Sequence, residues 1–324
     1  MKAIIPVAGE GTRLRPHTFV MPKSLMNVGG KPIIDHILAK AMSSGIEDFA
    51  FIIGYKGDEI RDYIEAHYSF NCRFYVQDKM LGLAYAVRLA SDYLTDDPVL
   101  IILGDTIFDT DLDPVFKTGI SSLGVQKVDD PRRFGTVELN NDGVITRLVE
   151  KPQNPRSNLA IVGLYYIEKG AILKDCIDEL LEKKKKTAGE FQITDALQIM
   201  IERGETIRTF PVHEWCDCGK PETILSTNHR LLSKRTEEIS IPGSLVRSPV
   251  FIDPTSEIEH SIIGPSTTVA RNAQIRNSII FNSIVGENAK IADSILRDSI
   301  IGNHSHISGT LKSLNISDYS DISF

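Results

Sequence analysis

The sequence of 324 residues has few cysteines, no long apolar run and no excess of basic residues. Its four cysteines, at positions 72, 176, 216 and 218, lack the C-x-x-C spacing of zinc and redox sites, so we expect free thiols in a reducing compartment. The net charge of -7 argues against a general nucleic-acid binder, whose binding face is basic. No segment is typical of a signal peptide or a membrane span. We therefore expect a cytoplasmic protein that binds neither nucleic acids nor membranes.

Strand and helix patterns alternate over the first 236 residues. The expected strands lie at residues 3–7, 49–53, 73–76 and 99–103, and the expected helices at 32–44, 58–67 and 82–94. This alternation predicts a Rossmann-like α/β domain, a mixed and mostly parallel sheet with helices on both faces. Ligands of such sheets bind at the carboxyl ends of strands. We expect residues 1–236 to form a catalytic domain with its site at that edge.

The composition changes after residue 238, where short Asn/Asp-Ser-Ile units recur. Aliphatic residues return there in steps of five or six, at Ile263, Val269, Ile275, Ile280, Val285, Ile291, Leu296, Ile301 and Ile307. This near-hexad spacing is typical of a parallel β-helix with three short strands per coil, whereas a β-sandwich would show stronger alternation and more hairpin turns. We expect a β-helix domain over residues 240–324 with four or five coils. The spacing alone leaves its handedness open.

The first apolar strand runs directly into a glycine-rich turn, and Lys23 follows a few residues later. The turn reads Ala8-Gly9-Glu10-Gly11-Thr12-Arg13. Its glycines let backbone N–H groups approach anionic oxygens, because no Cβ stands in the way. Arg13 can hold phosphate oxygens with its planar fork, and Lys23 adds a point charge. The turn lacks the Walker spacing, and Leu14 replaces the third glycine of the dinucleotide fingerprint. The pattern predicts a polyphosphate site of another kind.

The order Gly-x-Gly-Thr-Arg, Pro and Pro-Lys resembles the signature of sugar-1-phosphate nucleotidylyltransferases. Further segments resemble motifs of that family, in collinear order over residues 1–230. They are Gln77 with Leu81-Gly82-Leu83-Ala84, Leu103-Gly104-Asp105, Arg133-Phe134-Gly135, Glu150-Lys151-Pro152, Ala160-Ile161-Val162-Gly163, Gly189-Glu190 with Thr194-Asp195, and Trp215-Cys216-Asp217-Cys218-Gly219. The sequence is most similar to glucose-1-phosphate thymidylyltransferase-like enzymes with a C-terminal β-helix. That resemblance implies a left-handed β-helix.

The resemblance also implies the site residues. Asp105 and Asp217 would bind Mg²⁺, which commonly takes only one or two protein carboxylates beside substrate phosphates. The implied catalytic residues are Arg13, Lys23, Asp105, Lys151 and Asp217. The implied nucleotide-binding residues are Ala8, Gly9, Gly11, Thr12, Arg13, Gln77, Gly82 and Asp105. The implied sugar-phosphate-binding residues are Gly135, Glu150, Lys151, Val162 and Glu190.

The implied reaction joins a nucleoside triphosphate, dTTP or UTP, to a sugar 1-phosphate, foremost glucose 1-phosphate, and releases pyrophosphate. Thr106 stands where many relatives carry Asn or Asp, which leaves the choice of sugar or base open. Three alternatives remain: mannose 1-phosphate with GTP, an added acyltransferase activity with His304 and His306 as bases, and a non-catalytic regulatory homologue. Because the open ends of stacked coils must be covered, we also expect a homo-oligomer.

Overall fold

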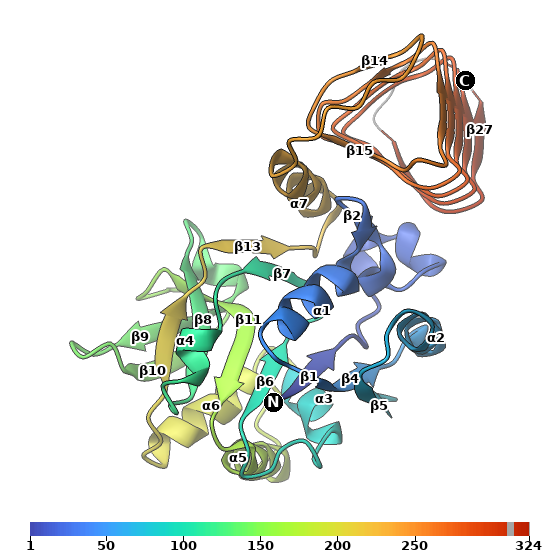
Figure 1. Ribbon diagram of the computed structural model, residues 1–324. Helices are drawn as coiled ribbons and strands as arrows, with labels where there is room; N and C mark the ends of the chain where they lie inside the picture. The colour runs from blue at the N-terminus through green and yellow to red at the C-terminus, as the bar shows by residue number, and fades with distance from the viewer. Residues whose placement is uncertain (310–313, 324) are drawn as a thin grey trace. The chain divides into compact units, whose positions relative to one another are not determined.

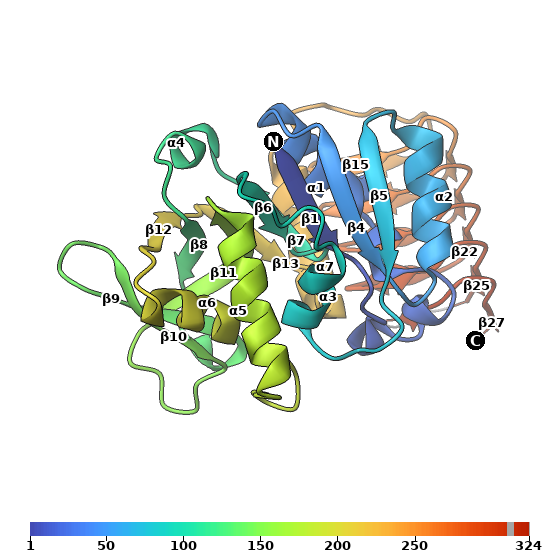
Figure 2. The same cartoon turned by 90° about the horizontal axis from the view of Figure 1, so that it is seen from below.

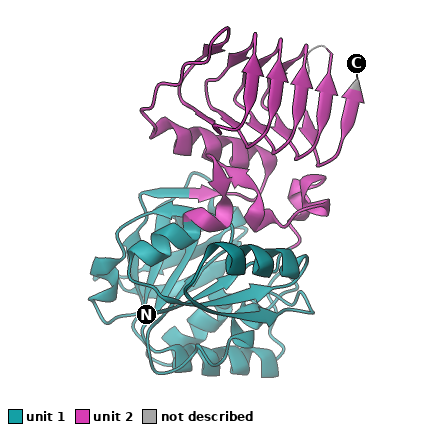
Figure 3. Ribbon diagram, turned by 45° about the vertical axis from the view of Figure 1, so that its right-hand side comes forward, with its two compact units in different colours: residues 1–9, 37–215 teal, residues 10–36, 216–324 magenta. Residues whose placement is uncertain are grey.

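A computed structural model describes residues 1–309 and 314–323. The chain forms two compact units (Figure 3): the first comprises residues 1–9 and 37–215, and the second residues 10–36 and 216–324. Residues 310–313 and Phe324, which belong to the expected β-helix, lie outside the described residues. The expected domain limits, 1–236 and 240–324, stay a prediction.

The first unit is built on a nine-stranded mixed sheet. The strands β1 (Lys2–Pro6), β4 (Asp48–Ile53), β5 (Asn71–Val76) and β6 (Val99–Ile102) pair in parallel, and Figure 2 shows β1, β4 and β5 side by side. The other strands are β8 (Ser122–Lys127), β9 (Gly135–Leu139), β10 (Ile145–Glu150), β11 (Leu159–Ile167) and β12 (Arg208–Pro211). Strand β11 runs antiparallel to β6, β8 and β9, and β10 runs antiparallel to β9. The sheet is thus parallel where helices connect its strands and antiparallel around β11.

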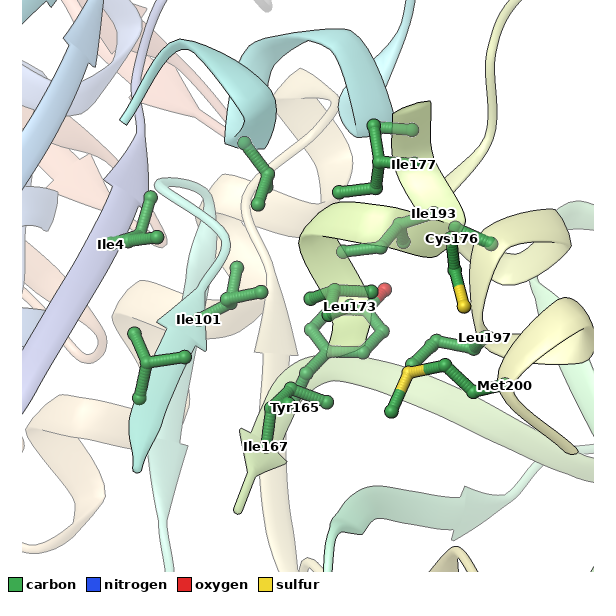
Figure 4. Close-up of a cluster of buried hydrophobic side chains, with 14 of the residues drawn as sticks. Ile4, Ile101, Tyr165, Ile167, Leu173, Cys176, Ile177, Ile193, Leu197 and Met200 are labelled. Carbon is green, nitrogen blue, oxygen red and sulfur yellow. The ribbon is translucent and has the colours of Figure 1, made fainter. Parts of the chain in front are cut away.

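Helices cover the sheet because their apolar stripes pack on it. Those that lie in the first unit are α2 (Gly57–His67), α3 (Leu83–Leu89), α4 (Asp113–Phe116), α5 (Gly170–Glu182) and α6 (Ile193–Glu202), together with the end of α1 (Ile33–Ser43). Residues of α3, α5 and α6 form one buried cluster with β1, β4, β6 and β11 (Figure 4). The expected helix at 82–94 ends earlier, at Leu89. The α/β architecture expected from the sequence is confirmed.

The second unit contains a left-handed parallel β-helix whose three sides form a triangular prism (Figure 1). One side consists of β14 (Leu245–Val246), β17 (Ile262–Ile263), β20 (Ile279–Phe281) and β23 (Ile295–Arg297). A second consists of β15 (Val250–Ile252), β18 (Thr267–Val269), β21 (Ile284–Val285), β24 (Ile300–Ile301) and β26 (Asn315–Ile316). The third consists of β16 (Glu257–Glu259), β19 (Gln274–Arg276), β22 (Lys290–Ala292), β25 (His306–Ser308) and β27 (Asp321–Ser323). The nine aliphatic residues of the repeat point inward and are at most 2% exposed, which confirms the predicted β-helix.

The corners of the β-helix explain the recurring Asn and Asp residues. Residues 272, 277, 282, 288, 293 and 298, all Asn or Asp, have φ between 45° and 56°. Asn and Asp tolerate this left-handed conformation better than other non-glycine residues. Side chains also bond from coil to coil, as in Asn277 Nδ2 donating to Asp293 Oδ1 at 3.1 Å. The same residues thus turn the chain and stabilise the stack.

Two further parts of the second unit pack against the β-helix. They are helix α7 (Pro221–Ser233) and the N-terminal segment 10–36, which carries the hairpin β2 (Asn27–Val28) and β3 (Lys31–Pro32). Asn228 of α7 is fully buried, accepts hydrogen bonds from Gly29 N and Thr268 Oγ1, and donates one to Ser266 O. None of the helices in residues 1–309 and 314–323 has the length and apolar character of a membrane span.

We expect a partly buried histidine of the second unit to make stability depend on pH. His36 hydrogen-bonds the Val28 carbonyl at 2.8 Å, and burial lowers its pKa from 6.5 to about 4. Between these pH values the unfolded chain binds the proton and the folded chain does not, so stability falls as the pH drops from 6.5 towards 4. The loss approaches ~3 kcal/mol. Chemical denaturation of His36→Gln should show a flatter pH profile in this range than the wild type. An equal slope in both, or the same flattening in the surface variant His67→Gln, would contradict this origin.

Candidate active site

The expected phosphate turn and Asp105 follow neighbouring parallel strands of the first unit. Gly104 N donates to Pro6 O at 3.2 Å, and a Cβ on Gly104 would lie 2.4 Å from Val7 Cγ1. Only glycine allows this approach, which places Asp105 beside the end of β1. Ala8 is buried there, whereas Gly9 is exposed. The structure thus brings the beginning of the turn and Asp105 to the same edge of the sheet.

The residues expected to read the nucleobase lie after β5. Gln77 is 7% exposed, and its backbone N–H donates to Ile53 O at 2.7 Å. Gly82 has φ +111°, and a Cβ there would lie 2.9 Å from the Cβ of Glu190. Phe191 N donates to Leu81 O, so the segment before α6 is tied to the segment before α3. Gly82 and Glu190, assigned to different substrates from the sequence, therefore lie together.

A second group forms around Glu150 at the end of β10. Thr194 Oγ1 donates to Glu150 Oε2 at 2.8 Å, and Lys151 Nζ lies 3.6 Å from Glu150 Oε1. A Cβ on Gly135 would lie 3.0 Å from Glu150 Oε2 and 3.2 Å from Thr194 Oγ1. The Glu150 side chain is 11% exposed and that of Lys151 is 48% exposed. The group therefore offers a held carboxylate to hydroxyl donors and an accessible ammonium to a phosphate.

Strand β11 connects these groups within the first unit. Val162 O accepts a hydrogen bond from Thr106 Oγ1 at 3.2 Å, directly after Asp105. Gly163 has φ +83°, and the pairing of β11 with β8 shifts register between Ile161 and Tyr165. The pKa of Tyr165 is raised, first by burial and then by the charges of Glu150 and Asp105. The negative charges of both carboxylates thus raise the pKa of the same buried Tyr165 hydroxyl.

Two supporting contacts of this site were not specified by the sequence. One is the Thr194 hydrogen bond to Glu150, since the sequence placed Thr194 only at the border of the sugar site. The other is an edge-to-face contact of Phe134 with Trp215, whose ring centroids lie 4.9 Å apart. Both aromatic residues belong to motifs identified in the sequence, but a contact between segments about 80 residues apart leaves no local signal.

We expect Thr194 to hold the Glu150 carboxylate for the sugar. In Thr194→Val the partly exposed Glu150 carboxylate loses a hydrogen-bond donor, and hydrogen bonds to charged groups are worth about 1.5–3 kcal/mol. The KM for sugar 1-phosphate should then rise about tenfold or more, with the KM for the triphosphate much less affected. Thr194→Ser keeps the hydroxyl and should remain close to wild type. Equal effects of Val and Ser, measured by steady-state kinetics, would contradict a role of the hydroxyl.

The rest of the predicted phosphate turn lies in the second unit. Gly11 has φ +62° and precedes a short 3-10 turn, Thr12–Leu14. Thr18 Oγ1 donates to Gly11 O at 2.9 Å, and a Cβ on Gly11 would lie 3.2 Å from the Cβ of Lys23. Gly11 and Lys23, separated by twelve positions, are therefore adjacent, and the turn needs glycine for both its conformation and its space.

Arg13 and Asp217 also lie together in the second unit. A Cβ on Gly219 would lie 2.8 Å from Asp217 Oδ1 and 3.0 Å from Arg13 Nη2. Both side chains therefore lie beside the space that Gly219 leaves open, although the two residues are about 200 positions apart in the sequence. The predicted catalytic residues are divided between the units: Asp105 and Lys151 belong to the first, and Arg13, Lys23 and Asp217 to the second.

The carboxylates fit Mg²⁺ by their chemistry, because Mg²⁺ prefers hard oxygen ligands and needs few from the protein. In residues 1–309 and 314–323 no group of three or more His, Cys, Asp or Glu side chains is arranged to hold a metal. All four cysteines are free, as expected.

The two histidines considered for acyl transfer lie on the β-helix. His304 is a corner residue with φ 56°, and its ring stacks on Tyr319 with centroids 4.6 Å apart. His306 is exposed on β25, in register with Lys290 and Asp321.

A family model described as nucleotidyl transferase matches residues 2–234. The chain therefore belongs to the nucleotidyl transferase family and is a sugar-1-phosphate nucleotidyltransferase. It is 32% identical to the low-salt glycan biosynthesis nucleotidyltransferase Agl11 of Haloferax volcanii, over 88% of this chain and 87% of that protein. It is 38% identical to the bifunctional protein GlmU of Methanocaldococcus jannaschii, over 74% of this chain and 56% of that protein. It is 30% identical to the glucose-1-phosphate thymidylyltransferase of Streptomyces antibioticus, over 88% of this chain and 87% of that protein.

Solved structures agree with this assignment. A crystal structure of UDP-glucose pyrophosphorylase complexed with UDP-glucose matches with a TM-score of 0.63 and 26% identity, over 72% of this chain and 99% of that one. The family expected from the sequence motifs is therefore confirmed.

Proposed function

We propose that this protein joins dTTP or UTP to glucose 1-phosphate, yielding an NDP-glucose and pyrophosphate. The observation that carries the proposal is the group of Gly135, Glu150, Lys151 and Thr194, which offers a carboxylate to sugar hydroxyls and an ammonium to the sugar's phosphate. Relatives named for thymidylyl transfer and for UDP-glucose support the choice of substrates.

In the proposed reaction a phosphate oxygen of the sugar 1-phosphate attacks the α-phosphorus of the triphosphate. One P–O bond forms, the bond to the β-phosphate breaks, and pyrophosphate takes the electron pair. The nucleophile is already an anion near neutral pH, so no general base is needed. The main difficulty is to bring two polyanions together, which requires positioning and positive charge.

Each charged residue then has a distinct role. Lys151 anchors the incoming phosphate, and Glu150, held by Thr194, accepts hydrogen bonds from the sugar. Arg13 holds the departing β- and γ-phosphates, and Lys23 neutralises the phosphoryl oxygens as charge builds up in the transition state. Mg²⁺ bound by Asp105 and Asp217 would supply further positive charge to the triphosphate oxygens.

The nucleotide-binding residues support this arrangement. The backbone at Ala8, Gly9, Gly11 and Thr12 would approach the triphosphate, while Gln77 and Gly82 would contact the base. Val162 and Glu190 would line the sugar pocket beside Gly135. Gly82 and Glu190 lie together, which suits a site in which the nucleoside and the sugar meet.

Pyrophosphate release with Mg²⁺ tests the proposal directly. Five nucleoside triphosphates should be combined with glucose, mannose and amino-sugar 1-phosphates. We expect the highest kcat/KM for glucose 1-phosphate with dTTP or UTP, and weak discrimination between these two, because one methyl group separates their bases. A clear preference for GTP and mannose 1-phosphate would replace the substrates, and no release from any pair would favour a regulatory homologue.

One observation keeps an acyltransferase alternative open: the similarity to GlmU, whose name describes a bifunctional protein. Consumption of acetyl-CoA in the presence of amino-sugar phosphates would detect that activity. If it occurs, His304→Ala or His306→Ala should abolish it and leave pyrophosphate release unchanged.

A further inference from the structure

One side of the β-helix, formed by β15, β18, β21, β24 and β26, is covered by other parts of the second unit. Its outward residues in register are Phe251, Thr268, Ile284, Ile300 and Asn315. Two of them, Ile284 and Ile300, are at most 4% exposed and line a small cavity together with Met21 and Leu25. The N-terminal segment 10–36, which carries part of the predicted phosphate turn, therefore packs along this side.

The last residue of this row interrupts its apolar character. Asn315 of β26 stands in register with Ile300, so an amide replaces the aliphatic side chain of the preceding coil. Its Oδ1 accepts a hydrogen bond from Nε2 of His17, a residue 298 positions away. His17 is 2% exposed, whereas Asn315 is exposed. Burial lowers the pKa of His17, so the ring stays neutral near neutral pH. The amide thus satisfies a buried polar group that would otherwise lack a partner.

His17 lies between the two cations of the phosphate turn, Arg13 and Lys23, and begins a short 3-10 turn. The next residue, Thr18, is 1% exposed, and its Oγ1 donates to Gly11 O at 2.9 Å. Gly11 in turn lies beside Lys23, because a Cβ on Gly11 would be 3.2 Å from the Cβ of Lys23. The contacts therefore continue from the coil that contains β26, through two buried neighbours, to the glycine that shapes the turn.

We propose that His17 and Asn315 are positioning residues for the triphosphate, because their hydrogen bond fixes the segment that carries Arg13 and Lys23 to the β-helix. This inference rests on the proposed role of those two cations. Electrostatic stabilisation of a transition state requires charges that are held in place before the substrate binds. In this view the coil that contains β26 supports the phosphate turn.

The difference in burial between the two partners sets the expected effects. In Asn315→Leu the His17 N–H stays buried without its acceptor, which is costly. In His17→Leu the exposed Asn315 amide can hydrogen-bond water, so no buried donor remains unsatisfied. We expect triphosphate affinity to fall about tenfold in Asn315→Leu and about threefold in His17→Leu. The double variant should resemble His17→Leu, because it too lacks the buried donor.

Calorimetric titration with dTTP, UTP and GTP in the presence of Mg²⁺ measures this affinity without turnover. His17→Gln places an amide nitrogen near the position of Nε2 and should bind triphosphate as the wild type does. The matched control is Gln274→Leu, which removes an exposed amide from β19 on another side of the β-helix and should also leave affinity unchanged. If Asn315→Leu does not fold, the comparison of His17→Leu with His17→Gln carries the test.

Steady-state kinetics separates positioning from stability alone. The KM for triphosphate should rise in Asn315→Leu, whereas the KM for sugar 1-phosphate should stay close to that of the wild type, since Glu150 and Lys151 belong to the first unit. Reduced thermal stability with unchanged triphosphate affinity would overturn the proposal. Equal increases of both KM values, or additive losses in the double variant, would do the same.

The two readouts also distinguish this inference from the proposed function. If the variants show the expected order of triphosphate affinities but the wild type releases no pyrophosphate, the positioning role stands and the proposed reaction fails. If the wild type releases pyrophosphate but all variants bind triphosphate equally, the reaction stands and the positioning role fails. A wild type that binds none of the triphosphates would overturn both.

Discussion

Asp105→Asn should reduce kcat for pyrophosphate release by about 100- to 1000-fold, the loss typical when one electrostatic contact to the transition state is removed. Asn preserves the shape of the side chain and removes its negative charge, so its affinity for Mg²⁺ falls. Asp105 follows β6 and lies beside the end of β1, where the approach of Gly104 to Val7 holds the loop. The fold should therefore tolerate the change. Steady-state kinetics over a range of Mg²⁺ concentrations measures the effect, and the variant should need more Mg²⁺ for half-maximal rate.

The matched control for this variant lies at the other end of the same strand. Asp96 is exposed and precedes β6, whereas Asp105 follows it. Asp96→Asn makes the same change of charge and should leave kcat and the Mg²⁺ requirement unchanged. Near-normal turnover of Asp105→Asn, with unaltered thermal stability, would remove Asp105 from the proposed metal site.

Lys23→Ala should lose most of kcat, by about 100- to 1000-fold, with a smaller effect on the KM of either substrate. The reason is that its charge acts on the oxygens where negative charge builds up in the transition state. Lys23 begins a 3-10 turn, and its Cβ lies beside Gly11. Single-turnover kinetics at saturating substrates would separate this step from product release.

Two variants define the specificity of that effect. Lys31→Ala removes a cation from β3 in the same segment and should keep normal turnover. Lys23→Arg retains the charge with a different shape, so it should recover part of kcat. If Lys23→Ala mainly raised KM, the charge would act in ground-state binding, and the proposed role would be wrong.

The repeats of the β-helix were predictable because each residue's position depends on its near neighbours in sequence. Ile275 and Ile280 point inward because five residues separate one prism side from the next. Asn277 turns the corner between them because it accepts a left-handed conformation. The strands of the first unit were predictable for the same reason, since β1 and β6 are short apolar runs. The early end of α3 could not be predicted, because the helical spacing of apolar residues continues in the sequence beyond Leu89.

The candidate site was only partly predictable. The motifs specified Glu150 and Lys151, but the hydrogen bond from Thr194 depends on how α6 packs beside β10. Likewise, the sequence placed Arg13 and Asp217 in separate motifs without indicating that both lie beside Gly219. Contacts of this kind join segments that are remote in the chain.

The amino-acid sequence by itself determined the repeat period, the inward residues of the β-helix, the α/β pattern and the family motifs. Each of these depends on the spacing of residues that are near one another in the sequence. Only the tertiary structure decided that residues 10–36 join the β-helix unit. Tertiary structure also decided which apolar side of the prism is covered. Ile284 and Ile279 are equivalent in the repeat, but the first is 3% exposed and the second remains partly open. That difference arises because α7 and the N-terminal segment pack on one side of the prism, and long-range packing has no signature in local spacing.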